Sequence, residues 1–164
     1  MRIGLGYDLH RLTAGRPLYL GGLRIPSDKG LRGHSDGDAL VHALIDALLG
    51  AAGEGDIGRL FPDTDPSYKN IRSTILLEKV VRRLRAKGLR PDHVDVVVVT
   101  EAPRLGPHFE AMKEILSPLL GLPGDRIGLK AKTNEGLGDI GKGRALACFA
   151  VASLKKIPKR KTSR

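Results

Sequence analysis

The sequence predicts an α+β fold, a single domain with helices packed on one face of a mixed β-sheet. Alternating or β-branched segments typical of strands occur near both ends of the chain and in its middle, and segments with apolar residues at helical spacing lie between them. The chain has 164 residues, the size of one domain with one core, and we assign residues 1–157 to it. Residues 158–164 are expected to form a basic, disordered tail.

The first half of the chain is expected to supply strands followed by helices. Its expected elements are a strand (1–12), a hairpin punctuated by two glycines (16–26), a helix (38–53), a loop rich in Gly, Pro and Asp (54–70) and a second helix (72–87). Ser35 and Asp38 have the spacing of a capping box, so we expect them to cap the first helix.

The second half is expected to place one more helix among strands. The nearly continuous β-branched run at 94–100 is typical of a buried strand. A third helix (107–120) is expected to end before a turn rich in Gly and Pro, and residues 126–133 are expected to form another strand. The Ala-rich segment 144–154 fits either a strand or a helix.

Cysteine usage limits the chemistry that the chain can perform. Cys148 is the only cysteine, which excludes an internal disulfide framework and a cysteine-based zinc knuckle. A metal would therefore be held by His and carboxylate side chains. The same observation favours a reducing, intracellular setting. With no pattern of a leader peptide and no apolar segment approaching about 20 residues, we expect a cytoplasmic protein without a membrane partner.

The charge of the chain is concentrated at its carboxyl end. The formal net charge is +10, but residues 155–164 hold six of the basic side chains, which leaves 22 basic and 18 acidic residues in the rest. Aromatic residues make up only 4% of the chain, and no basic stripe with stacking residues occurs outside the tail. A nucleic-acid-binding module is therefore poorly supported, and no specific nucleic acid partner is expected.

Two histidines and a carboxylate form a candidate metal set. Asp8 and His10 are two residues apart on an expected strand and so share a face, as they would on a simple solvated strand. His42 lies on the first helix with Asp38 and Asp46 four residues before and after it, an arrangement typical of carboxylates that orient a metal-bound imidazole. One carboxylate and two imidazoles with an open fourth position have the form of a catalytic zinc site.

Two further segments carry candidate ligand-binding groups. His34 and Ser35 precede the helix that bears His42, where backbone N–H groups and the helix dipole can receive a phosphate, although Ser35 would serve equally as a helix cap. In the segment 129–143, Lys130, Lys132 and Thr133 supply donors, and Glu135 supplies an oxygen ligand suited to Mg²⁺ or Mn²⁺. Taken by itself, the segment 129–143 also has the pattern of an ordinary Gly-rich turn.

Three stretches resemble the 2-C-methyl-D-erythritol 2,4-cyclodiphosphate synthase family of the non-mevalonate isoprenoid pathway. They are "GYDLHRL" (6–12), "GHSDGDALVHALIDALLGAAGEGDIGRLFPDTDP" (33–66) and "KAKTNEGLGDIGKG" (130–143). The resemblance extends from residue 1 to about residue 155. It implies a phosphorus–oxygen lyase that cyclises 4-diphosphocytidyl-2-C-methyl-D-erythritol 2-phosphate with release of CMP. It also implies a homotrimer with active sites between subunits.

The resemblance also assigns roles to individual residues. It implies that zinc is bound by Asp8, His10 and His42, that a second divalent cation, Mg²⁺ or Mn²⁺, is bound by Glu135, and that the phosphates are held by His34 and Ser35. Catalytic roles are implied for His34, Thr133 and Glu135. The methylerythritol part matches Asp56, Gly58 and a mobile flap of Phe61, Pro62 and Asp63, and the cytidine pocket matches Thr100, Ala102, Pro103, Arg104, Leu105, Gly106, Ala131, Lys132 and Thr133.

The chain departs from this family at two positions. Arg144 stands where the family has a glutamate at the trimer centre, and on a strand it would share a face with Lys142, so that two like charges would need a counter-anion or water. Glu101 stands where an uncharged residue is expected, and it faces either solvent or the cytidine pocket. The same metal ligands would also serve a zinc-dependent nucleotide-diphosphate phosphohydrolase, which is the main alternative function.

Overall fold

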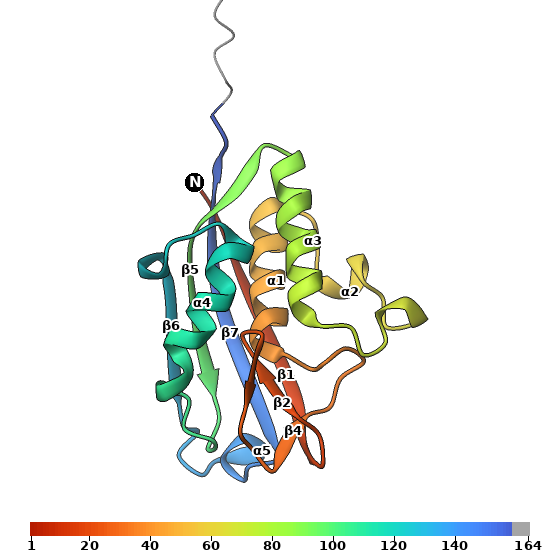
Figure 1. The fold of residues 1–164 in the computed structure, drawn as a ribbon, viewed down its shortest axis with the longest axis vertical. Helices are drawn as coiled ribbons and strands as arrows, with labels where there is room; N and C mark the ends of the chain where they lie inside the picture. Colours follow the sequence, from red (N-terminus) through yellow and green to blue (C-terminus); the bar gives the residue numbers. More distant parts are fainter. Residues whose placement is uncertain (159–164) are drawn as a thin grey trace, which may run out of the picture.

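A computed structural model describes residues 1–158, which form a layer of β-sheet covered by a layer of helices (Figure 1). The main sheet has the strand order β4-β1-β7-β5-β6, and β2 pairs with β3 in a separate ribbon. The strands are β1 (Arg2–Ala14), β2 (Leu18–Leu20), β3 (Leu23–Ile25), β4 (Lys29–Leu31), β5 (Leu89–Val99), β6 (Ile127–Lys132) and β7 (Ala145–Lys156). The helices are α1 (Ala39–Ala52), α2 (Ile57–Leu60), α3 (Ser73–Ala86), α4 (Phe109–Leu120) and α5 (Gly138–Gly141). Residues 159–164, most of the expected tail, lie outside the described residues.

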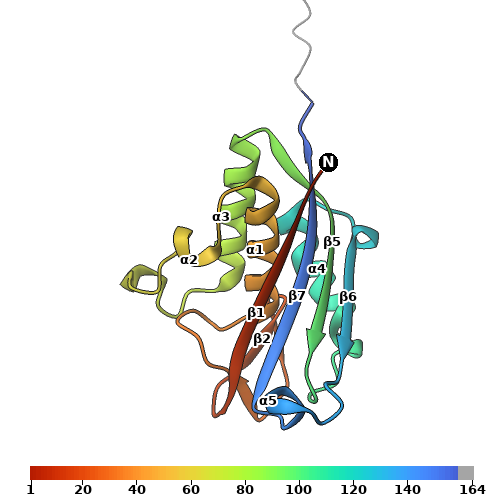
Figure 2. The same cartoon turned by 180° about the vertical axis from the view of Figure 1, so that it is seen from behind.

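The sheet is mixed, as the sequence predicts. β7 is antiparallel to β1 on one side and to β5 on the other, whereas β6 is parallel to β5. The long helices α1, α3 and α4 all cover the same face, and the view from behind shows the opposite face of the strands in front of them (Figure 2). The expected α+β domain with helices on one face is therefore confirmed.

The Ala-rich segment near the carboxyl end forms a strand and not a helix. In β7, Ala150 and Ala152 are fully buried, while Phe149 and Val151 between and beside them are exposed. This alternation has the period of a strand. Because the buried positions carry small side chains, α1 can lie close to the centre of the sheet.

Two glycines allow α1 to approach β1 even more closely. A Cβ atom added to Gly6 would lie 1.9 Å from the carbonyl oxygen of Ala43, and one added to Gly4 would lie 2.1 Å from that of Ala47. Both obstacles are helix backbone, which cannot rotate away as a side chain can. The two glycines therefore set the distance at which α1 presents its side chains to β1.

Substituting one of these glycines is expected to destabilise the protein. Gly6→Ala should lower the free energy of unfolding by about 3 kcal/mol, since a methyl group must push the helix off the strand. Thermal unfolding measures the effect. Gly124→Ala is the matched control, because an added Cβ there meets nothing within 4 Å. An unchanged midpoint for Gly6→Ala would contradict the close packing described here.

The start of α1 differs from the expected capping box. Its N-cap is Asp38, whose side chain accepts a hydrogen bond from Val41 N, and the expectation that Ser35 caps the helix is wrong. The Asp38 carboxylate is fully buried and also accepts hydrogen bonds from the amides of Gly21 and Gly22, so it ties the β2–β3 ribbon to α1. Burial raises the pKa of Asp38 above its ordinary value.

Several short elements are absent from the sequence prediction. β4 lies between the expected hairpin (16–26) and the expected helix (38–53), where no strand was predicted, and it pairs with the end of β1. The helices α2 and α5 each span only four residues and carry no detectable helical period. β5 begins at Leu89, before the β-branched run. No helix within residues 1–158 has both the length and the apolar character needed to cross a bilayer.

The face of the sheet opposite the helices is apolar and exposed. Ile3 and Leu5 of β1 are 61% and 68% exposed, and Tyr7 packs its ring 4.8 Å from the ring of Phe149 on β7. Monomeric proteins seldom expose a contiguous apolar patch of this kind.

Candidate active site

Asp8, His10 and His42 meet at the contact between β1 and α1. The alternation of β1 points Asp8 and His10 towards the helix, as expected from their spacing, and α1 supplies His42. Asp8 Oδ2 lies 3.0 Å from His10 Nδ1 and 3.0 Å from His42 Nδ1. One ligand atom from each residue lies within 4.8 Å of the others. The sequence-predicted triad is therefore assembled in space.

The donor atoms of the triad fit a metal ion. His10 Nδ1 is buried and makes no hydrogen bond to any residue that the structure describes, although it lies close to Asp8. A buried nitrogen without a partner is costly unless another group, such as a metal, accepts its lone pair. Two imidazole nitrogens and one carboxylate oxygen also form a common set of ligands for zinc.

The charge state of the triad is set by its mutual contacts. Burial raises the pKa of Asp8, but contacts with His10 and His42 outweigh burial and lower it to about 2. Burial lowers the pKa of His42, whereas the hydrogen bond and charge of Asp8, with the charges of Asp38 and Asp36, raise it above the ordinary value. Asp8 is therefore an anion at neutral pH and attracts a cation or a proton to the neighbouring imidazoles.

The far side of the His42 ring is held by hydroxyl groups, not by the carboxylates expected from the sequence. His42 Nε2 lies 2.8 Å from Ser73 Oγ and 3.0 Å from Ser35 Oγ. Ser73 Oγ in turn donates to Asp36 Oδ1. The Asp36 carboxylate can only accept a hydrogen bond, so the hydroxyl proton of Ser73 is used in that bond. Ser73 Oγ therefore accepts a hydrogen bond from His42 Nε2–H, and Nδ1 is the ring nitrogen of His42 that faces Asp8.

The expected partners of His42 bind elsewhere. Asp38 caps α1 as described, and Asp46 accepts a hydrogen bond from Ile57 N at 2.7 Å, so it fixes the start of α2. The expectation that these two carboxylates hold the His42 ring by hydrogen bonds is wrong. Ser73 and Asp36 were not singled out in the sequence, because Ser73 lies 31 residues from His42 along the chain and Asp36 has no recognisable spacing from it.

The hydroxyl contact gives a testable expectation. Ser73→Ala should weaken the binding of a metal ion at the triad by roughly 10- to 100-fold, the scale of losing a group that orients a metal ligand. The hydroxyl of Ser35 limits the loss because it contacts the same nitrogen. Competition with a chelator measures the affinity, and Ser153→Ala on β7 is the control. Equal affinities in the two variants would show that Ser73 does not orient the ring.

The triad opens into a cavity of about 380 Å³. Its lining includes most of the expected zinc, phosphate and methylerythritol residues together with three that the sequence did not single out. The expected members are Asp8, His10, His34, Ser35, His42, Gly58, Phe61 and Asp63, and the additional ones are Ile57, Tyr68 and Leu76. Asp56 and Pro62 are not in the lining, and the Asp56 side chain caps α2 by accepting from Arg59 N.

His34 and two residues of the expected flap, Phe61 and Asp63, line this cavity. His34 Nε2 lies 3.3 Å from the carbonyl oxygen of Asp65, which accepts its proton. Phe61 packs edge-on against Tyr68, with ring centroids 5.3 Å apart. At the start of α1, Ala39 and Val41 are fully buried, and the Val41 amide donates to the Asp38 side chain. His34 and Ser35 present their side chains to the cavity wall.

The remaining expected site residues lie on a different part of the sheet. Among residues 1–158, the lining of the triad cavity includes none from 100–106 or 131–135. Segment 100–106 follows β5, and residues 131–135 cover the end of β6 and the loop after it. In the sheet, β7 and β5 lie between β1 and β6. Three strand spacings correspond to about 14 Å. The expected site residues of one chain therefore lie in two separate groups, here called half-sites.

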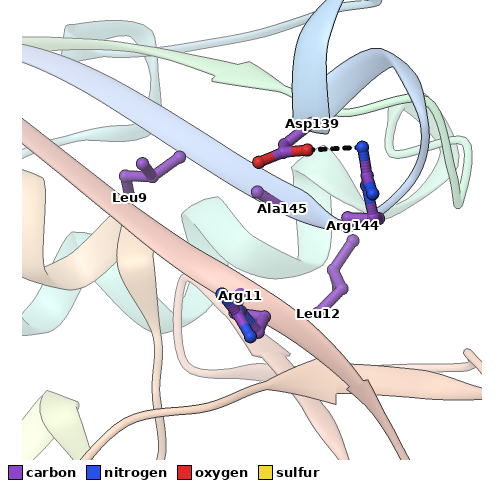
Figure 3. Close-up of a pocket in the computed structure, with 6 residues that line it drawn as sticks. All are labelled: Leu9, Arg11, Leu12, Asp139, Arg144 and Ala145. Carbon is purple, nitrogen blue, oxygen red and sulfur yellow. Dashed lines mark ion pairs between the residues drawn. The ribbon is translucent and has the colours of Figure 1, made fainter.

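Arg144 has a counter-anion that the sequence did not reveal. Lys142 and Arg144 precede β7 and are not on a strand, so the expected shared face is wrong. Arg144 Nη2 instead lies 2.8 Å from Asp139 Oδ1 (Figure 3). This ion pair lines a cavity of about 390 Å³ together with Leu9, Arg11 and Leu12 of β1 (Figure 3).

Comparison with known proteins agrees with the geometry. A model described as the YgbB family matches residues 1–155. The chain belongs to the YgbB family. Its YgbB-like relatives include the 2-C-methyl-D-erythritol 2,4-cyclodiphosphate synthase of Gloeobacter violaceus, which is 56% identical over 95% of this chain and 96% of its own length. The family resemblance inferred from the three sequence stretches is therefore confirmed.

Solved structures extend the YgbB comparison to the fold. A 2C-methyl-D-erythritol-2,4-cyclodiphosphate synthase described as the CDP-bound form is 50% identical and has a TM-score of 0.87, covering 94% of this chain and 100% of that one. The bifunctional IspDF from Campylobacter jejuni is 41% identical and has a TM-score of 0.91. The match covers 95% of this chain but only 42% of the bifunctional protein.

Proposed function

We propose that this chain converts 4-diphosphocytidyl-2-C-methyl-D-erythritol 2-phosphate to 2-C-methyl-D-erythritol 2,4-cyclodiphosphate and releases CMP. The observation that carries the proposal is the triad of Asp8, His10 and His42, which opens into one cavity with His34 and Gly58 in a chain of the YgbB family. The reaction belongs to the non-mevalonate isoprenoid pathway. The enzyme is a phosphorus–oxygen lyase.

Two cations complete the proposed site. Asp8, His10 and His42 would hold zinc, and Glu135 would hold Mg²⁺ or Mn²⁺. When bound, these cations supply Lewis-acid polarisation of the diphosphate and neutralise its charge. The exposed Glu135 carboxylate has one oxygen held by Thr133, and carboxylate oxygens are the ligands that Mg²⁺ prefers.

The protein's own residues then have the task of folding the substrate. The nucleophile is the 2-phosphate of the substrate itself, so no Ser, Cys or His nucleophile is required. A P–O bond forms between the 2-phosphate and the β phosphorus as the bond to CMP breaks. Holding the two groups near contact replaces an improbable collision by an intramolecular step.

Individual side chains are assigned to parts of this task. His34 and Ser35 would hold the phosphates beside the triad. Asp56 and Gly58 at the start of α2, with the segment Phe61–Asp63, would hold the methylerythritol part. Phe61 and Tyr68 form an apolar wall that would limit the access of water. Thr133 orients Glu135, and Lys132 provides positive charge next to it.

The cytidine group is assigned to the other half-site. Segment 100–106 follows β5, and residues 131–133 end the neighbouring parallel strand β6, so both lie at one end of the sheet. Thr100 and Leu105 are buried there, whereas Arg104 and Lys132 are exposed. The CDP-bound form of a 50% identical relative supports a small-molecule cytidine ligand, not a nucleic acid.

A homotrimer would bring the two half-sites together. The separation of the half-sites on one chain supports an active site completed by a neighbouring subunit. The exposed apolar face of β1 and β7, which includes Ile3, Leu5 and Phe149, supports an interface on that side of the sheet. The expected cytoplasmic location remains part of this proposal.

Product analysis tests the proposed function. The purified protein, loaded with zinc and supplied with Mg²⁺, should convert the cytidyl substrate to CMP and a cyclic diphosphate in equal amounts, which ³¹P NMR can follow. A zinc-dependent phosphohydrolase would produce an open-chain phosphate with the same ligands. Open-chain product without the cyclic compound would therefore replace the proposed function by the hydrolase alternative.

A further inference from the structure

The loop after β6 holds Glu135 in an unfavourable backbone conformation. Glu135 has a φ of +51°, and two glycines that follow it in the loop, Gly136 and Gly138, have φ values of +74° and +63°. The left-handed region costs a residue other than glycine about 1–2 kcal/mol. Such a conformation persists when the surrounding contacts fix it.

The side chain of Glu101 contacts the backbone on both sides of Glu135. Asn134 N donates to Glu101 Oε1 at 2.7 Å, and Gly136 N donates to the same oxygen at 3.4 Å. A single carboxylate oxygen therefore joins the residue before Glu135 to the residue after it. Hydrogen bonds that end on a carboxylate are stronger than those between neutral groups.

The strand order explains why Glu101 can reach this loop. β5 and β6 are parallel neighbours, so the segments that follow them begin at the same edge of the sheet. Thr100 N donates to the carbonyl oxygen of Lys132 at 2.9 Å, which continues the pairing to the base of the loop. Backbone pairing aligns the base, and the Glu101 side chain reaches the turn beyond it.

Thr133 and Glu101 act on different parts of Glu135. Thr133 Oγ1 donates to Glu135 Oε1 at 2.8 Å and orients the carboxylate, whereas Glu101 fixes the backbone on either side. We propose that Glu101 is a positioning residue that holds the Glu135 cation site ready before substrate arrives. This inference rests on the proposed function for the role of Glu135. The proposal assigns a role to Glu101, which is one of the two positions at which the chain departs from the family.

Two substitutions distinguish the role of Glu101 as a hydrogen-bond acceptor from the role of its negative charge. Glu101→Ala removes the acceptor, while Glu101→Gln keeps a carbonyl oxygen at the same place. In Glu101→Ala, the amide protons of Asn134 and Gly136 should exchange with solvent at least about tenfold faster than in wild type. In Glu101→Gln they should stay within about threefold. Glu114→Ala, an exposed position on α4, is the matched control.

The second measurement connects the loop to the cation. If the competent loop conformation falls to a minor fraction in Glu101→Ala, the Mg²⁺ concentration for half-maximal CMP release should rise about five- to tenfold, and saturating Mg²⁺ should restore kcat. Zinc content should not change. A purely structural role would instead lower zinc content, melting temperature and kcat together.

The outcomes distinguish this inference from the proposed function. Unchanged exchange at both amides in Glu101→Ala would overturn it, and so would faster exchange with an unchanged Mg²⁺ requirement. Exchange does not depend on catalysis. If the wild-type protein released no CMP, the proposed function would fail, whereas the exchange result would still show whether Glu101 holds the loop.

Discussion

A His42→Ala chain is expected to bind no zinc and to release CMP at least about a thousandfold more slowly than wild type. His42 supplies one of only two imidazoles in the triad, and its Nδ1 lies 3.0 Å from the Asp8 carboxylate. Removing it leaves a pair of ligands from one strand. The fold should survive, because α1 keeps its fully buried leucines at 40, 44 and 48. Elemental analysis and the CMP assay measure the two losses.

The matched control for this variant is His93→Ala, which removes an exposed histidine from β5. It should retain zinc and rate. The melting temperature of His42→Ala should be close to that of wild type from which zinc has been removed by a chelator. Full zinc content in His42→Ala would exclude the triad as the metal site.

Glu135→Gln is expected to slow CMP release by roughly two orders of magnitude or more, the scale of losing one preorganised electrostatic contact in a transition state. The amide keeps the shape of the side chain, and its oxygen can still accept from Thr133 Oγ1. Zinc content should remain that of wild type, because the triad lies on another part of the sheet. Raising Mg²⁺ or Mn²⁺ should recover part of the rate by mass action.

Glu114→Gln provides the matched carboxylate-to-amide control at an exposed position. Its rate and Mg²⁺ requirement should equal those of wild type. A wild-type rate and an unchanged Mg²⁺ requirement in Glu135→Gln would show that another group binds the second cation.

Local periodicity was sufficient to predict most of the regular elements. The two-residue spacing of Asp8 and His10 placed them on one face of β1, and the helical spacing of the leucines placed His42 on α1. The triad could therefore be anticipated without tertiary information. The distance between β1 and α1 at the triad could not be predicted, because it depends on two glycines of β1 that face helix backbone.

Features that depend on tertiary packing could not be predicted from the sequence. Ser73 reaches His42 only because α3 packs beside α1, and Asp36 joins them through a loop. The ion pair of Arg144 with Asp139 arises from the four-residue helix α5, which has no periodic signal. The capping box was a valid local pattern, but Asp38 is the residue that caps α1, and its buried carboxylate also accepts hydrogen bonds from Gly21 N and Gly22 N at the β2–β3 ribbon.

Subunit mixing tests the central claim, that the zinc half of the site lies on one chain and the Glu135 half on its neighbour. His42→Ala and Glu135→Ala subunits, each inactive alone, should regain activity when mixed and exchanged. In a random equimolar mixture of trimers, an interface works only when a Glu135→Ala chain supplies zinc ligands to a His42→Ala neighbour, which gives about one quarter of wild-type activity. Recovery near that level is the predicted result. No recovery, in mixtures shown by native mass spectrometry to contain mixed trimers, would contradict a site shared between subunits.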